Sequence, residues 1–232
     1  MPAAARDDTV TIEVNGARLR GDRSGAVVWP ERRTLVVADL HLEKGSAFAA
    51  RGQLLPPYDT AATLQSLSEA LRRHRPERVI CLGDSFHDGE ASARLSNGDG
   101  DTIRDLTRRH EWIWICGNHD PAPPAQWGGR AMDSFTLGSL VFRHEAEPGA
   151  AAAGEVSGHF HPKAAVKTRA KRVTSRCFVT DGRRLILPAF GAYTGGLNVL
   201  DPAIARLFRK GFNVHILGRG RLFTFPHSAL SH

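Results

Sequence analysis

The sequence predicts a mixed α/β or α+β domain, and three observations support this fold class. Helical and extended patterns alternate in the first half of the chain, whereas short extended segments dominate the last third. Several of these segments are apolar runs with the length of buried strands. The chain has 232 residues, of which 41% are hydrophobic and 24% charged, as expected for one globular domain with a sizeable core. Late strands favour two stacked sheets over one doubly wound sheet.

The first third of the chain predicts a hairpin, two more strands and one helix. Asn15-Gly16 is typical of a two-residue hairpin turn, and alternating apolar and polar residues precede it. A helix should begin at Asp59 or Thr60, whose side chains can cap its first turn, and it should end near Pro76. Strands are expected over residues 9–14, 17–20, 26–29 and 35–38.

The rest of the chain predicts two loops, a short helix and many strands. Residues 88–101 are polar and contain glycine, which indicates a surface loop, and a short helix should follow over residues 102–110. Residues 146–154 are rich in alanine and glycine and predict a second loop. No internal repeat divides the chain, so we expect a single domain over residues 1–232, with a flexible N-terminus over residues 1–8. Strands are expected over residues 79–82, 112–116, 140–142, 164–168, 176–180, 184–187, 197–200, 214–217 and 222–225.

Charge and cysteine content narrow the class of protein. The formal net charge of +7 favours polyanionic partners such as nucleic acid, nucleotides or acidic lipid headgroups. No apolar run approaches the ~18 residues of a membrane span, and the N-terminus lacks the apolar core of a secretory signal. The three cysteines lack metal-site spacing, and Cys81 and Cys116 are expected to be buried thiols in core strands. We therefore expect a reduced, cytoplasmic protein with no membrane association and predict no particular oligomeric state.

Residues of metal-binding type follow several of the apolar runs. Each motif alone is common, because Gly-Asp is usually a turn and a lone histidine is more often structural. Five such motifs in order, each just after a strand, argue against a purely structural explanation. The carboxyl ends of strands are where open sheets bind ligands, and Asp, His and Asn suit hard to borderline divalent metals. The motifs are Asp39-Leu40-His41, Gly83-Asp84, Gly117-Asn118-His119-Asp120, the single His144, and Gly158-His159-Phe160-His161.

These motifs resemble those of the calcineurin-like metallophosphoesterase superfamily. Further segments extend the likeness over roughly residues 27–199 and are similar to bacterial DNA-ligase-associated metallophosphoesterases. The resemblance implies a four-layer α-β-β-α sandwich of two mixed sheets flanked by helices. It also implies a nucleic-acid or nucleotide phosphodiester as substrate, a setting in DNA repair, and association with a DNA ligase and a helicase. The further segments are 38–45, 82–87, 159–162, 187–191 and 194–196.

The number of candidate donors suits two ions, because seven ligands are too many for one ion with an open position. The resemblance implies that the ions are divalent, with Mn²⁺ as first choice and Fe or Zn²⁺ as alternatives. Two such ions about 3.5–4 Å apart grip a phosphate and lower the pKa of a bridging water, whose hydroxide attacks phosphorus in line. By resemblance, Asp39, His41 and His161 hold the first ion, Asn118, His144 and His159 hold the second, and Asp84 bridges both.

The resemblance also implies one catalytic residue without metal contact, and one departure from the superfamily pattern affects it. His119 would donate to the phosphate oxygen or to the leaving alkoxide. In many members an acid three residues after the bridging Asp84 orients this histidine, whereas here that position is His87, with Asp88 beside it. Two alternatives stay open: Asp88 orients His119 across a longer turn, or His87 itself contacts the substrate.

A basic segment bears on the substrate. Six Lys or Arg residues fall between Lys163 and Arg176. They form either a solvated edge hairpin that its charge protects from aggregation, or a strip that follows the phosphates of a nucleic acid. The leading function is therefore a dinuclear phosphodiesterase. One alternative is a small-molecule phosphomonoesterase or protein phosphatase, which would need extra arginine near the metals. The other is a non-catalytic subunit of a repair complex, against which the complete ligand set argues.

Overall fold

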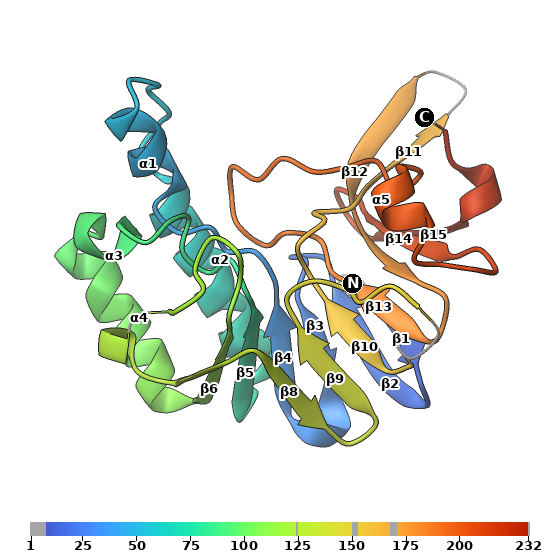
Figure 1. The fold of residues 1–232 in the computed structure, drawn as a ribbon. Helices are drawn as coiled ribbons and strands as arrows, with labels where there is room; N and C mark the ends of the chain where they lie inside the picture. The colour runs from blue at the N-terminus through green and yellow to red at the C-terminus, as the bar shows by residue number, and fades with distance from the viewer. Residues whose placement is uncertain (1–7, 124, 150–152, 168–170, 232) are drawn as a thin grey trace, which may run out of the picture.

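The computed structural model describes residues 8–123, 125–149, 153–167 and 171–231, and it shows a sandwich of two mixed β-sheets (Figure 1). The predicted flexible N-terminus lies outside the described residues except for Asp8. In the first sheet β1 to β4 are antiparallel and β4 to β7 are parallel. Its strands, in spatial as well as chain order, are β1 (Thr9–Val14), β2 (Ala17–Asp22), β3 (Val27–Trp29), β4 (Thr34–Val37), β5 (Arg78–Leu82), β6 (Glu111–Ile115) and β7 (Arg130–Met132).

Apolar runs of the first sheet are buried on both faces. In β5, Val79 and Cys81 belong to the core beneath the helices, whereas Ile80 and Leu82 belong to the core between the two sheets. Successive side chains of a strand point to opposite faces, so a strand covered on both sides needs a continuous apolar run rather than an alternating one. This explains why the four-residue run ahead of Gly83 predicts a strand correctly.

Helices cover the outer face of the first sheet. The predicted helix start at Asp59 is right, but the predicted caps are wrong, because no side chain caps α2. Asp59 instead accepts a hydrogen bond from the Gly45 N–H (2.9 Å), and Thr60 accepts one from the Glu43 N–H (2.8 Å). These bonds fasten the start of α1 to the start of α2. The helices on this side are α1 (Lys44–Ala50), α2 (Asp59–His74), α3 (Ala91–Arg94) and α4 (Asn97–Arg109).

The second sheet packs its inner face on the first and carries a thin outer layer. A third apolar core lies on its outer face, where α5 (Pro202–Ala205), β11 and the segment around Phe208 and Phe212 pack. The expected α-β-β-α sandwich is thus confirmed, with little helix on this side. The spatial order is β15-β14-β12-β13-β10-β9-β8, and β11 pairs with β12. The strands are β8 (Ser134–Leu137), β9 (Leu140–Arg143), β10 (Glu155–Ser157), β11 (Lys163–Lys167), β12 (Arg172–Thr180), β13 (Arg184–Ile186), β14 (Asn213–Leu217) and β15 (Leu222–Pro226).

Three further local expectations were wrong. The predicted loop over residues 88–101 contains α3 and the start of α4, because Ser96 caps α4 at the Asp99 N–H and its apolar side chains pack under α2 and β6. The predicted strand over residues 197–200 is a turn that makes only an isolated bridge, because the Asn198 side chain accepts from the Leu200 N–H. Cys116 is partly exposed rather than buried, since it follows β6 instead of lying within it.

Five strands end at one side of the sandwich. β4, β5 and β6 run parallel in the first sheet, and β9 and β10 run parallel in the second. α1 and the β11–β12 hairpin both project at the side where the connections after these strands lie (Figure 1). Among the residues that the structure describes, no helix is long and apolar enough to cross a bilayer.

Candidate metal centre

The structure brings all seven candidate metal donors together from the two sheets. Asp39 and His41 follow β4, Asp84 follows β5 and Asn118 follows β6, all in the first sheet. His144 follows β9, and His159 and His161 follow β10, all in the second sheet. The site therefore lies at the seam where both sheets end, as the motif positions predict.

One group of donors consists of Asp39, His41 and His161. Their ligand atoms all lie within 4.8 Å of one another. The Nε2 atoms of His41 and His161 are 3.2 Å apart, and His161 Nε2 is 3.5 Å from Asp39 Oδ1. This is the set that the resemblance assigns to the first ion.

The second group of donors consists of Asn118, His144 and His159. Asn118 Oδ1 lies 2.7 Å from His144 Nε2 and 3.1 Å from His159 Nδ1. The two ring nitrogens are themselves 3.1 Å apart. This is the set that the resemblance assigns to the second ion.

Asp84 stands between the two groups. Its Oδ2 atom is 3.9 Å from His41 Nε2 in the first group and 3.4 Å from His144 Nε2 in the second. Its other oxygen accepts a hydrogen bond from the His119 N–H (2.9 Å), which fixes the orientation of the carboxylate. Asp84 is therefore the carboxylate within reach of both groups, as a bridging ligand must be.

The spacing and chemistry of these donors fit divalent ions. Ligands that share one ion at about 2.0–2.2 Å lie about 3–3.4 Å from one another, and the closest contacts within each group fall near that range. His144 donates from Nδ1 to the Leu82 carbonyl (2.8 Å), so Nε2 is the nitrogen that faces the other donors and binds an ion once it is deprotonated. The donor set is nitrogen and oxygen without thiolate, so it suits Mn²⁺, Fe or Zn²⁺.

The loops that carry the donors adopt backbone conformations that side chains rarely take. Positive φ for a non-glycine residue costs roughly 1–3 kcal/mol and persists only where the surroundings enforce it. Here the enforcement includes backbone bonds between loops, such as that from the His41 N–H to the Asp84 carbonyl (2.9 Å). Strain is therefore concentrated in the donor loops. Five of the seven donors have positive φ: Asp39 (53°), His41 (44°), Asp84 (46°), His159 (70°) and His161 (46°).

Close packing between the loops requires one of the predicted glycines. A Cβ atom on Gly83 would lie 2.4 Å from His144 Nδ1, and Gly83 has a φ of +74°. Only glycine allows His144 to reach the Leu82 carbonyl from above this turn. The Gly-Asp motif therefore serves both the turn and the seating of a ligand from the other sheet.

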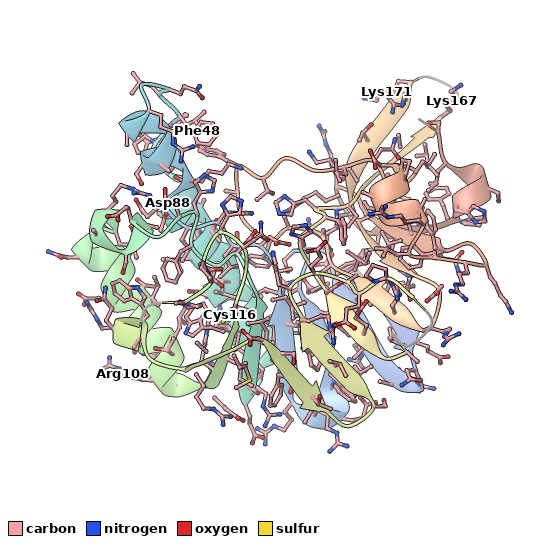
Figure 2. All side chains as sticks on the ribbon, in the orientation of Figure 1. Phe48, Asp88, Arg108, Cys116, Lys167 and Lys171 are labelled. Atoms are coloured by element: carbon pink, nitrogen blue, oxygen red, sulfur yellow. The ribbon has the colours of Figure 1, made fainter. Side chains whose placement is uncertain are left out.

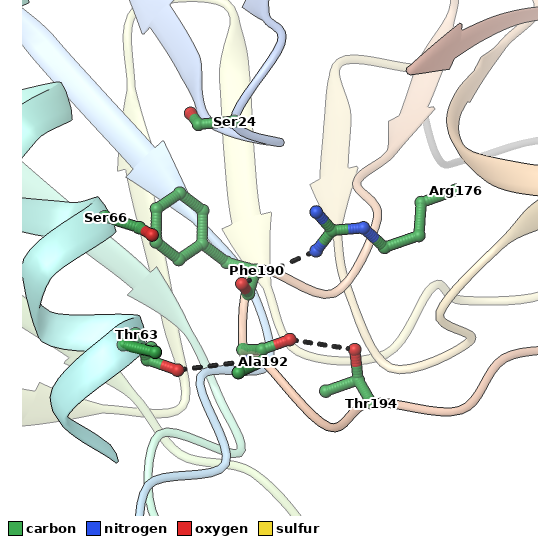
Figure 3. Close-up of a pocket in the computed structure, with 9 residues that line it drawn as sticks. Ser24, Thr63, Ser66, Arg176, Phe190, Ala192 and Thr194 are labelled. Atoms are coloured by element: carbon green, nitrogen blue, oxygen red, sulfur yellow. Dashed lines mark hydrogen bonds between the residues drawn. The ribbon is translucent and has the colours of Figure 1, made fainter. Parts of the chain in front are cut away.

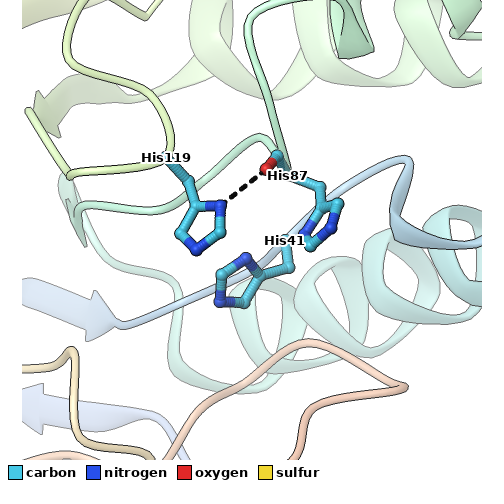
Figure 4. A group of neighbouring side chains, drawn as sticks. All are labelled: His41, His87 and His119. Carbon is cyan, nitrogen blue, oxygen red and sulfur yellow. Dashed lines mark hydrogen bonds between the residues drawn. The ribbon is translucent and has the colours of Figure 1, made fainter. Parts of the chain in front are cut away.

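His119 sits beside the donors, and its orienting partner is a backbone group. Its Nδ1–H donates to the carbonyl oxygen of His87 (2.8 Å), and its ring lies edge-on to His41 with centroids 5.1 Å apart (Figure 4). The His87 ring stacks on that of His119 at 5.2 Å between centroids. A carbonyl only accepts, so the bond fixes the tautomer in which Nδ1 carries the proton.

The alternative in which Asp88 orients His119 does not match the structure. The Asp88 carboxylate pairs with Arg94 (2.6 Å) and accepts from the Glu90 N–H (3.0 Å). It thus caps the turn that leads into α3. The His87 carbonyl takes the place of the missing acid, and the His87 side chain, with His41 and His119, forms a three-histidine cluster.

Asp120 is a residue that sequence reasoning missed. It is buried, and its Oδ2 accepts from the Ser85 N–H (2.8 Å) and the Phe86 N–H (3.1 Å). It thereby joins the loop of Asn118 and His119 to the loop of Asp84. Burial raises the pKa of Asp120 to about 7, together with the charge of Asp84 and against the two backbone bonds. Its place as the fourth residue of Gly-Asn-His-Asp was the available signal.

The charges of the site act differently on its histidines when no metal is bound. Burial and the neighbouring His161 hold the pKa of His41 well below its usual range. Burial also lowers the pKa of His144, but the hydrogen bond to Asp84 and the charges of Asp39 and Asp84 outweigh it and raise that pKa to about 9. In the metal-free protein, His144 is therefore favoured over His41 to carry an additional proton.

This proton predicts a pH dependence of metal binding. His144 must lose its proton to bind an ion, so the apparent affinity of the second position should fall as the pH falls below about 9, by about tenfold per unit for one proton. Ring NMR of His144 in the metal-free protein should show a titration midpoint near pH 9. A midpoint at or below the ordinary histidine value would contradict the linkage.

The chain is similar to several known proteins. The family model described as calcineurin-like phosphoesterase matches residues 32–189, more than half of the chain. The crystal structure of the nuclease MPE of Pseudomonas putida is 27% identical, with a TM-score of 0.72, over 94% of this chain and 100% of that one. Yfce, a phosphoesterase from E. coli, is 13% identical with a TM-score of 0.41, over 85% of this chain and 99% of that one. No curated protein matches in sequence. The chain therefore belongs to the calcineurin-like phosphoesterase family, whose members hydrolyse phosphoester bonds with the help of divalent metals.

Proposed function

We propose that this protein is a dinuclear metal-dependent phosphodiesterase that cleaves nucleic-acid strands, in DNA repair and alongside a DNA ligase and a helicase. The observation that carries the proposal is the convergence of the seven donors with His119 beside them. The P. putida protein is a nuclease and resembles this chain along almost its whole length, which supports a nucleic-acid substrate.

Each residue of the site has a definite task in this proposal. The seven donors hold two divalent ions, Mn²⁺ as first choice with Fe or Zn²⁺ as alternatives, and these ions, when bound, polarise the phosphate and activate water. The Nδ1–H group of His119 donates to the His87 carbonyl, and Nε2 faces the substrate. With the ring protonated at Nε2 as well, that second proton passes to the leaving alkoxide as the alkoxide's bond to phosphorus breaks, and His119 is left as the neutral tautomer with its proton on Nδ1.

The surroundings of the site favour a diester over a monoester. A hollow of about 450 Å³ is lined by His159, His161, Glu145 and the exposed Arg206. A second hollow of about 530 Å³ is lined by Asn118, His144 and, again, Glu145. A strand passing over the scissile phosphate needs room on both sides, whereas a dianionic monoester needs several cations around one pocket. Among the described residues, Arg206 is the one arginine that lines the first hollow, and Arg143 in the second pairs with Glu147.

The basic hairpin supports the strand-binding role in part. Lys167, Lys171 and Arg172 are exposed, and Figure 2 shows the two lysines at the tip of the β11–β12 hairpin. Arg169 lies outside the described residues. Arg176 does not belong to the exposed strip, because it turns inward and donates to the Ala189 carbonyl (2.6 Å).

Neutralising the hairpin separates the substrate classes. Changing Lys167, Lys171 and Arg172 together to Gln should leave hydrolysis of a small diester such as bis-p-nitrophenyl phosphate within a few-fold of wild type. Oligonucleotide affinity should fall, and the slope of log affinity against log salt should flatten by about 0.7 per lost contact with a single strand. The matched control changes three exposed arginines remote from the hairpin, Arg18, Arg20 and Arg108, to Gln. An unchanged slope in the hairpin variant would show that the hairpin is a solvated sheet edge without a role in strand binding.

A substrate panel tests the proposal as a whole. The purified protein, loaded with Mn²⁺, is given single-stranded and duplex oligonucleotides, cyclic nucleotides, a small diester and a small monoester. We expect diester turnover and cleavage of strands, with two metals per chain by elemental analysis. Turnover of the monoester alone would replace the phosphodiesterase by a phosphomonoesterase, and two metals without any turnover would indicate the non-catalytic subunit.

A further inference from the structure

A hydroxyl-lined pocket lies behind the segment that follows β13. It has a volume of about 310 Å³ (Figure 3). Thr63 and Ser66 of α2, Ser24 of the β2–β3 turn, Arg176 of β12 and Thr194 all line it. The segment belongs to the stretch 187–196, whose sequence is part of the family resemblance but which supplies no metal donor. The pocket and this stretch thus have no task in the proposed reaction.

Arg176 brings a positive charge into the pocket without a carboxylate partner. Its NH1 group donates to the carbonyl of Ala189 (2.6 Å) and lies 3.5 Å from that of Phe190. No ion pair is formed by Arg176 with any described Asp or Glu, and no acidic side chain lines the pocket. Burial lowers the pKa of Arg176 from its ordinary value, but a guanidinium stays charged under all ordinary conditions. Because a guanidinium has five N–H donors, several remain for a ligand.

Hydroxyl protons supplement this charge. The oxygens of Ser24 and Thr63 accept from the backbone N–H groups of Ala26 (3.3 Å) and Ala192 (3.0 Å), so each hydroxyl can still donate its own proton. Within the described part of the chain, the Ser66 hydroxyl has no hydrogen-bond partner. A half-buried cation and three available hydroxyl donors line this pocket, and none of its described lining residues is acidic, so the pocket is complementary to an oxyanion.

We propose that this pocket binds a phosphate group. Tetrahedral phosphate offers acceptors in several directions, which matches a guanidinium and hydroxyls contributed by three separate elements. The pocket also leaves room for part of an attached sugar. The phosphate comes either from a nucleotide of the bound strand away from the cleaved bond, or from free inorganic phosphate.

The pocket is joined to the metal centre through Gly191. This residue lines the pocket, and its N–H donates to the carbonyl of Asp39 (3.1 Å). A Cβ atom here would lie 2.1 Å from the Leu40 carbonyl oxygen, so glycine is needed for this approach. A phosphate held by Arg176 therefore braces the segment that supports the loop between Asp39 and His41.

Counting phosphate equivalents tests the inference. Calorimetric titration of inorganic phosphate into the Mn²⁺-loaded full chain should give one equivalent at the metals and one in the pocket. Ser66→Asp should remove one equivalent, because a carboxylate then faces the anion, and Ser66 is exposed and tolerates the change. Gln65→Asp adds the same charge on the same helix outside the pocket and should keep both equivalents.

The phosphate equivalent bound at the metals rests on the proposed function, whereas the equivalent bound in the pocket does not. The outcomes therefore test the pocket separately from the proposed function. Equal stoichiometry in wild type and Ser66→Asp overturns the pocket, whatever happens at the metals. Loss of the equivalent in Ser66→Asp, even in a protein without turnover, supports it. An oligonucleotide KM raised about tenfold in Ser66→Asp relative to Gln65→Asp identifies the phosphate as one of the strand. An unchanged KM with the lost equivalent identifies free phosphate.

Discussion

Replacing Asp84 by asparagine should remove both metal ions and lower turnover by at least about 10³-fold. The loss of one stabilising group at a reaction centre typically costs about 10²–10³, and this carboxylate serves both donor groups. Its Oδ2 lies 3.9 Å from His41 Nε2 and 3.4 Å from His144 Nε2, so one change weakens both positions. The measurements are metals per chain by elemental analysis and kcat for the small diester.

Asp105→Asn is the matched control for this change. Asp105 lies on α4 in pairs with Arg109 and Arg108, away from the donors, and the same loss of charge should leave both metals and turnover in place. Two metals bound with near-native turnover in Asp84→Asn would eliminate the dinuclear assignment. One metal retained would show that Asp84 belongs to a single position.

Replacing His119 by alanine should separate chemistry from metal binding. The His119 side chain packs edge-on against His41 and is not one of the seven candidate donors. We expect both metals to stay bound while kcat falls by about 10²–10⁴, the range for loss of a general acid. The fall should shrink for diesters with good leaving groups, because these need little protonation.

His110→Ala controls for the removal of a histidine. His110 pairs with the carbonyl of Pro76 just before β6, at the strand end opposite the donors, and its loss should be neutral for turnover. The decisive readout is the slope of log kcat against leaving-group pKa, which should steepen in His119→Ala. Equal losses for good and poor leaving groups would instead assign His119 to phosphate binding.

The convergence of the seven candidate donors could be predicted because each lies just after an apolar strand. A buried strand fixes its own register, so the first polar residues after Leu82 or Ile115 must emerge at the same edge of the sheet. Three of the five motifs contain glycine, and one of these glycines, Gly83, adopts a φ of +74°. The fold class followed from the same strands, whose two apolar faces demand cover on both sides.

Other parts of the site could not be predicted, because backbone groups carry them. The orienting partner of His119 is the carbonyl of His87, and any residue supplies a carbonyl. The sequence therefore left Asp88 as a candidate, although its carboxylate pairs with Arg94. The role of Asp120 could not be predicted for a related reason, because its carboxylate accepts hydrogen bonds from the backbone N–H groups of Ser85 and Phe86.

Tertiary packing overrode local preference elsewhere. The start of α4 contains Asn97 and two glycines, which disfavour helix and predicted a loop. The helix forms because Ser96 caps it and because Ile103 and Leu106 are buried against the first sheet. Asp59 and Thr60 are suited to capping a helix, but tertiary contacts use their side chains to join the starts of α1 and α2 instead.

The origin of the donors in two different sheets has a mechanical consequence. The sheets otherwise meet through apolar side chains, whose burial holds them together. An ion held by Asp39, His41 and His161, or by Asn118, His144 and His159, would be a cross-link between the halves of the sandwich, fastened at one end of the seam. Metal binding then raises the free energy of unfolding, by about 1.4 kcal/mol for each tenfold excess of free ion over its dissociation constant. The ions that take part in the reaction would therefore also stabilise the contact between the two sheets.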